Sequence, residues 1–229
     1  MPVFGVNGSW SVRRGWVCSA ASARTATSAY FSAMPPMFLL TNLYLQQGLG
    51  LAAVYAGMVS IGFALMSAIG SWLGGRLVNR LGRPLVVWGL VIVFAGIGLL
   101  VLAALTTPAA VTPWAMAGAM ALGGVGGGFV ISPNQTLTLA DIPPKQGGLA
   151  GSVGQLGQRI GTAVGTAVGL SLFYSTIYRE NGSVESADLS VYHDAYGFGM
   201  LSVAIFVAIA FAVGVADLRA RRRERRALA

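Results

Sequence analysis

Long apolar stretches, separated by short polar connectors that carry glycine and proline, make up most of the chain. The hydrocarbon layer of a membrane is about 30 Å thick, so a helix that rises about 1.5 Å per residue needs roughly 20 mostly apolar residues to cross it. Six stretches reach that length: Ser28–Gln47, Leu51–Gly74, Pro84–Leu105, Trp114–Leu139, Leu149–Tyr174 and Gly197–Ala216. The pattern therefore predicts six membrane-spanning helices.

The same pattern divides the chain into three regions. Residues 1–27 show neither a span nor helical periodicity, residues 28–217 form the predicted six-helix transmembrane bundle, and residues 218–229 form a basic cytoplasmic tail. The connectors are predicted at Gly48–Gly50, Gly75–Arg83, Thr106–Pro113, Asp141–Gly148 and Ile177–Tyr196.

Composition places the chain in the all-α integral membrane class. Hydrophobic residues make up 55% of the chain, charged residues make up 10%, and the mean hydropathy is +0.70. A soluble domain carries about 25% charged residues, and it could not hide this much apolar surface from water. The 32 glycines also suit a membrane bundle, because small residues let helix backbones approach closely there.

Basic residues fall on one side of the predicted spans. All 15 except Arg159 and Arg179 precede the first span or follow the second, fourth or sixth span. Cytosolic connectors carry an excess of Lys and Arg, so we predict a multi-pass protein of the plasma membrane with both termini in the cytoplasm. The arginines from Arg219 to Arg226 have three interpretations: an orientation signal, a contact with anionic lipid headgroups, or a contact with nucleic acid. We take the first, with membrane lipids as a partner and no nucleic acid.

Residue types that carry catalysis or bind metals are sparse. Cys18 is the one cysteine, which excludes an internal disulfide, and His193 is the one histidine and sits in a predicted polar connector. No strand precedes the glycine run 123–128 and no Lys-Ser/Thr follows it, as a phosphate loop would require, so close helix packing explains it better. The sequence therefore predicts no enzyme, no cofactor and no metal site.

The connector after the second span reads GRLVNRLGRP, from Gly75 to Pro84. Its glycines permit a tight reversal, and its arginines favour the cytosolic side. The stretch resembles the loop signature of the major facilitator superfamily, Gly-x-Leu-(small)-Asp-Arg-x-Gly-Arg-(basic). Asn79 stands where that signature has Asp, and Pro84 stands where it has a basic residue. The resemblance implies a gating loop made of Gly75, Asn79, Arg80, Gly82 and Arg83.

Three further stretches extend the resemblance: YLQQGLGLAAVYAGM, GGGFVISPNQTLTLADIPPKQGGLAGS and GQRIGTAVG. From about Tyr30 to the end, the chain looks like the second half of the fourteen-span drug/proton antiporter branch, especially its actinobacterial members. The resemblance implies one six-helix bundle, which is half of a major facilitator fold. The implied partners are a second six-helix bundle (the missing N-terminal half or another chain), a small-molecule substrate and protons.

The fifth predicted span carries two distinct faces. At 100° per residue, one polar stripe contains Gln155, Gln158, Arg159, Thr162 and Thr166. Glycines recur at every fourth position as a predicted packing seam, which we call the glycine seam: Gly157, Gly161, Gly165 and Gly169. Arg159 lies between the cytosolic interface and the middle of the membrane. It either snorkels and packs there or takes part in a pathway or gate.

Polar residues within the predicted spans are candidates for a transport pathway, because polar groups in a membrane favour a cavity over lipid. The superfamily resemblance places the first, second, fourth and fifth helices of a half around the central cavity. The candidates are Asn42, Gln46, Asn134, Gln135, Gln155, Gln158 and Arg159.

Two functions follow from these observations. The first is secondary active transport, as proton-coupled efflux of small amphipathic compounds or drugs by two six-helix bundles, of which this chain would supply the C-terminal one. No acidic residue lies deep within a predicted span, so the proton carrier would belong to the other half. The alternative is a truncated or regulatory membrane protein that does not transport.

Overall fold

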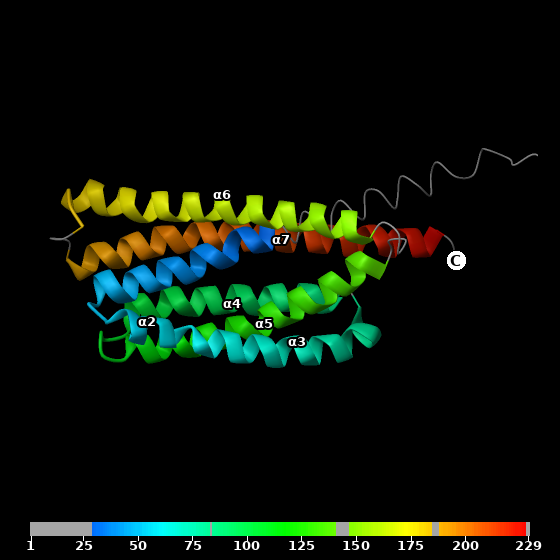
Figure 1. The fold of residues 1–229 in the computed structure, drawn as a ribbon, viewed down its shortest axis with the longest axis horizontal. Coiled ribbons are helices and arrows are strands. Elements are labelled where there is room, and N and C mark those ends of the chain that lie inside the picture. The colour runs from blue at the N-terminus through cyan, green and yellow to red at the C-terminus, as the bar shows by residue number, and fades with distance from the viewer. Residues whose placement is uncertain (1–28, 83, 141–146, 185–187, 228–229) are drawn as a thin grey trace, which may run out of the picture.

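The computed structural model describes residues 29–82, 84–140, 147–184 and 188–227, and the regular structure in these ranges is helical. A helix over residues 29–43 leads into the π-helix η1 (Tyr44–Gly48). The helices that follow are α2 (Ala53–Val59), α3 (Ile61–Leu81), α4 (Pro84–Thr106), α5 (Thr112–Ala140), α6 (Gly147–Asn181) and α7 (Leu189–Ala227). They lie side by side along one long axis (Figure 1).

The all-helical class is confirmed, but several predicted helix ends are wrong. The second predicted span consists of two helices, α2 and α3, which are separated at Ser60. The connector predicted at Ile177–Tyr196 is helical at both ends, because α6 continues to Asn181 and α7 begins at Leu189. Hydropathy marks only the part of a helix that crosses hydrocarbon, so it misses turns that extend beyond the membrane.

Five helical stretches in the described part of the chain are long and apolar enough to cross a membrane. They are Ala53–Val78, Pro84–Thr106, Thr112–Ser132, Gly151–Asn181 and Leu189–Ala216. The first predicted span corresponds to the helix over residues 29–43 together with η1, and the α-helical part alone is shorter than a span requires. The sixth crossing therefore stays a prediction.

Glycines let α5 pack closely against α3 and α4, which lie on either side of it. A β-carbon at Gly70 of α3 would lie 2.7 Å from the carbonyl oxygen of Val125. A β-carbon at Gly126 of α5 would lie 2.7 Å from the carbonyl oxygen of Gly89 in α4. Backbones approach this closely only where no side chain intervenes. The glycine run of α5 therefore lets the backbone of this helix approach the backbones of both α3 and α4.

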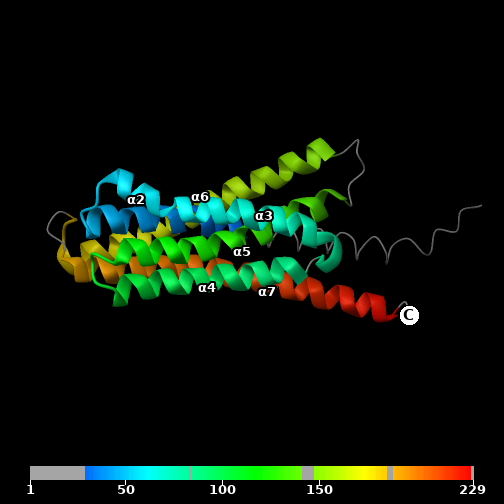
Figure 2. The same ribbon diagram turned by 90° about the horizontal axis from the view of Figure 1, so that it is seen from below.

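Residues 29–43 pack against α6 and α7. The side chain of Leu40 lies over two glycines, 3.4 Å from a β-carbon built at Gly169 of α6 and 3.0 Å from one built at Gly199 of α7. α7 also contacts α4, where Gly214 faces Val87. A second view shows α7 extending beyond α4 toward the C-terminus (Figure 2).

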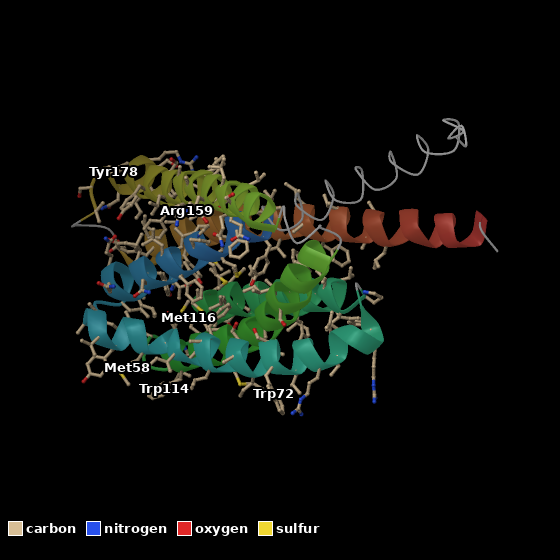
Figure 3. All side chains as sticks on the ribbon, turned by 45° about the vertical axis from the view of Figure 1, so that its right-hand side comes forward. Met58, Trp72, Trp114, Met116, Arg159 and Tyr178 are labelled. Carbon is tan, nitrogen blue, oxygen red and sulfur yellow. The ribbon has the colours of Figure 1, made fainter. Side chains whose placement is uncertain are left out.

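Large apolar side chains cover the outside of the bundle. The exposed fractions of Trp72, Trp88 and Trp114 are 57%, 65% and 80%, whereas Met116 is fully buried. Figure 3 places Met58, Trp72 and Trp114 at the edge of the bundle. This much exposed apolar surface is typical of helices that face lipid or a membrane-embedded partner.

Candidate functional site

The structure brings Asn42 and Gln46 together at the end of the first helix. The Gln46 amide nitrogen donates to the Asn42 side-chain oxygen at 3.3 Å, and the Asn42 amide donates to the Phe38 carbonyl oxygen at 3.4 Å. Gln46 lies in η1, and the neighbouring Gln47 donates to the hydroxyl of Tyr174 in α6 at 3.4 Å. A π-turn is rare and frequently marks a functional position. Gln47 therefore joins η1 to α6, next in sequence to the Asn42–Gln46 pair, and we refer to these three amides as the polar group.

The other candidates on α6 lie far from this polar group. Gln155 and Arg159 are exposed, and Gln158 is half-buried. From Gln155 to Tyr174 the helix rises about 28 Å at 1.5 Å per residue, so these residues lie toward opposite ends of α6. Figure 3 shows Arg159 and Tyr178 well separated along the same helix. The candidates with described side chains therefore form two groups: Asn42 with Gln46, and, toward the other end of α6, Gln155, Gln158 and Arg159.

The polar stripe of α6 changes its surroundings along the helix. Gln155 and Arg159 face outward, whereas Thr162 is half-buried and donates to the Phe31 carbonyl oxygen at 3.3 Å. The polar stripe of α6 is therefore exposed at Gln155 and Arg159 and contacts the first helix at Thr162.

Glycines of the predicted seam lie on the buried side of α6. Gly161, Gly165 and Gly169 are buried and Gly157 is half-buried. A β-carbon at Gly165 would overlap the carbonyl oxygen of Ser32. Helix 29–43 and α6 therefore approach each other backbone to backbone at Gly165.

Several candidates are placed only by their backbone. Asn134 and Gln135 lie in α5 and Asn79 lies in α3, and the structure does not describe their side chains. Arg83 lies outside the described residues, as do residues 1–27.

The predicted gating loop is mostly helical, which corrects its assignment as a connector. Gly75, Asn79 and Arg80 belong to α3, because this helix continues to Leu81. Gly82 ends the helix with φ +58° and ψ −134°, and its N–H donates to the Val78 carbonyl oxygen at 2.8 Å. Residues other than glycine rarely adopt this backbone conformation, so Gly82 determines where the chain reverses direction.

Arg76, earlier on α3 than Arg80, contacts an aromatic ring. The guanidinium carbon of Arg76 lies 3.8 Å from the centre of the Trp72 ring. Sequence reasoning missed this cation–π pair, although the spacing of four residues on a helix could have indicated it.

An aromatic cluster lies where η1 meets α7. The rings of Tyr44 and Tyr196 are 4.9 Å apart, and the hydroxyl of Tyr196 shares a hydrogen bond of 3.1 Å with Thr41. His193 was predicted to lie in a polar connector, but it is half-buried on α7 with its ring 5.7 Å from that of Tyr44. That prediction is wrong because α7 begins at Leu189 and so includes His193.

These observations define a multi-pass membrane protein whose helices are joined by glycine contacts and whose polar side chains gather at a few positions. Residues 15–180 match the Major Facilitator Superfamily, and the chain belongs to this superfamily. The match confirms the superfamily predicted from the connector after the second span. Members of this superfamily are transporters and not enzymes.

A curated relative agrees with this assignment. The chain is 27% identical over 158 residues to a Streptomyces coelicolor protein named "Probable actinorhodin transporter". The aligned part covers 69% of this chain and 27% of the relative. The chain therefore matches only a part of the length of this transporter.

Proposed function

We propose that this chain is the C-terminal six-helix half of a transporter of the fourteen-span drug/proton antiporter branch. With a second six-helix bundle, it exports small amphipathic compounds across the plasma membrane in exchange for protons. The observation that carries the proposal is the match to a named transporter over 27% of that protein's length, because such a match leaves room for a second bundle.

The outward face of α6 suits a partner bundle. It carries Gln155 and Arg159 beside the exposed apolar side chains Leu156 and Ile160. Polar and charged groups at membrane depth favour another protein surface or a water-filled cavity over lipid. In a carrier that works by rocking two bundles, such a face would line the interface around a central substrate site.

The described acidic residues support placing the proton carrier in the second bundle. Glu180, Asp188 and Asp194 lie at or near the connector between α6 and α7. Asp194 is five residues into α7, so it lies about 8 Å along the helix from Leu189. None of these three positions is near the middle of a span, and the other two described acidic residues, Asp217 and Glu224, follow the span that ends at Ala216.

Transport in sealed vesicles tests the proposal. We expect vesicles that hold this chain and a second six-helix bundle to move a fluorescent amphipathic dye, or actinorhodin, when a proton gradient is imposed. Vesicles that hold this chain alone should not move either compound. Transport by the chain alone would contradict its role as a half. No transport by both bundles, correctly inserted, would favour the regulatory alternative.

The proposed topology predicts which connectors are accessible from outside the cell. In a variant with Cys18 replaced by serine, a cysteine at Ser183 should react with a membrane-impermeant thiol reagent in intact cells, because Ser183 follows α6 on the predicted outer side. A cysteine at Leu81, at the end of α3, should react only after permeabilisation. The reverse labelling pattern would contradict cytoplasmic termini.

The end of α3 is proposed to act as a latch on the cytosolic side. Gly82→Val should strongly reduce efflux by the assembled transporter, because a β-branched residue is strained at φ +58° and ψ −134°. Arg80→Ala should cause a partial loss, because Asn79 replaces the acid of the superfamily signature. Efflux should be normalised to the amount of protein in the membrane.

Arg76→Ala is the matched control for Arg80→Ala, because it removes the same charge one turn earlier on α3. If the arginines only orient the helices, both variants should keep full efflux at unchanged abundance, and the latch would be ruled out.

A further inference from the structure

Two consecutive prolines lie in the interior of the first described helix. Pro35 and Pro36 fall within residues 29–43, well past the first turn. In an α-helix each N–H donates to the carbonyl four residues earlier, so the carbonyl oxygens of Phe31 and Ser32 are the ones opposite these prolines. Proline has no N–H to donate. A backbone carbonyl at membrane depth then needs another donor, which a neighbouring helix can supply.

α6 meets the helix at the same two residues. The Thr162 hydroxyl donates to the Phe31 carbonyl oxygen at 3.3 Å, which replaces the hydrogen bond that Pro35 cannot make. One turn later, the backbone of α6 comes so close to the Ser32 carbonyl oxygen that a β-carbon at Gly165 would overlap it. Thr162 and Gly165 are three residues apart and so share one face of α6.

The part of the helix after the prolines is held by α7 and α6 through different contacts. Thr41 is hydrogen-bonded to Tyr196 of α7 at 3.1 Å, and Leu40 packs over glycines of α6 and α7. This part carries Asn42, which bonds to Gln46. The two parts of the helix thus have separate attachments on either side of Pro35 and Pro36.

We propose that Thr162 is a positioning residue that supplies the hydrogen bond missing at Pro35, and that residues 29–34 form an arm that turns about Pro35 and Pro36. While Thr162 is bonded to Phe31, the arm stays against α6. When this bond opens, the arm moves while residues 37–43, with Asn42, stay in place. The proposal concerns this helix alone and does not depend on which compound is transported.

A double-mutant cycle between Thr162 and Pro35 tests this proposal on the full chain. Thr162→Val removes the hydroxyl and should lower the Tm by about 3 °C. It should also raise amide hydrogen exchange several-fold in residues 31–34 but not in residues 37–43. Pro35→Ala restores the N–H that can donate to Phe31, so adding Thr162→Val in that background should change neither the Tm nor the exchange.

The chain offers matched controls. Pro36→Ala restores an N–H that can donate to the Ser32 carbonyl oxygen and not to the Phe31 carbonyl oxygen. In that background, Thr162→Val should therefore still lower the Tm and raise the exchange. Thr162→Ser keeps the hydroxyl and should behave like the unmodified chain. An equal drop in Tm from Thr162→Val with and without Pro35→Ala would overturn the proposal. A loss from Thr162→Ser as large as that from Thr162→Val would also overturn it, and this comparison needs no proline variant to fold.

Discussion

Replacing Gly128 with alanine is expected to force α3 and α5 apart and to remove most of the folded protein. A β-carbon at Gly128 would overlap the backbone nitrogen of Ser71 and lie 2.6 Å from the carbonyl carbon of Gly70 and 2.7 Å from the carbonyl oxygen of Ser67. These are backbone atoms of α3, so no change of side-chain rotamer can relieve the contact. Overpacking of this kind costs about 1–3 kcal/mol, and a rigid backbone neighbour places Gly128→Ala at the upper end.

The measurement is the yield of monodisperse protein after extraction in a mild detergent, together with its Tm. Gly118→Ala on the same helix is the control, because nothing lies within 4 Å of a β-carbon there. Alanine at Gly118 should be neutral or slightly stabilising through its higher helix propensity, by up to about 1 kcal/mol. Equal yields of the two variants would show that α3 and α5 are not packed as described.

Replacing Gly165 with alanine is expected to detach helix 29–43 from α6, with a similar loss of folded yield. A β-carbon there would overlap the Ser32 carbonyl oxygen, which belongs to the backbone of the neighbouring helix. Gly165→Leu should be worse than Gly165→Ala, because a longer side chain separates the helices further.

Gly154 gives the matched control on α6, because a β-carbon at Gly154 has no neighbour within 4 Å. Gly154→Ala should keep the yield and Tm of the unmodified chain. If Gly165→Ala and Gly154→Ala gave the same Tm, helix 29–43 would not approach α6 at Gly165, and the glycine seam would have no packing role.

Local spacing predicted those parts of the fold that depend on neighbours in the sequence. The start of α4 at Pro84 was predicted, because proline is tolerated at the first helical position. The pairing of Asn42 with Gln46 follows from their separation by four residues on one helix. In both cases the information lies within a few residues of the feature.

Contacts between distant parts of the chain could not be predicted in the same way. The spacing of Gly165 with the other glycines predicts a close approach, but it does not identify Ser32 as the neighbour. The hydrogen bond of Tyr196 with Thr41 likewise depends on how α7 lies against the first helix. Helix ends outside the membrane were also missed, because Ile177–Asn181 and Leu189–Tyr196 continue their helices without the apolar pattern of a span.

Most contacts among the helices keep their pattern when the first three predicted spans are exchanged with the last three, but the close packing of α6 on α7 has only a weak counterpart in α3 with α4. α3 packs on α5, which pairs the second span with the fourth, and α6 packs on residues 29–43, which pairs the fifth with the first. The contact between α4 and α5 (third and fourth spans) corresponds to the contact between α7 and residues 29–43 (sixth and first spans). The contact between α4 and α7 (third and sixth spans) is unchanged by the exchange. If the first helix also crosses the membrane, each unit has three spans, and this pattern is the one expected of an inverted internal repeat about an axis in the membrane plane. Under this exchange the contact of Gly128 in α5 with α3 corresponds to the contact of Ser32 in the first helix with Gly165 in α6, so the glycine stands on opposite partners in the two backbone-to-backbone contacts.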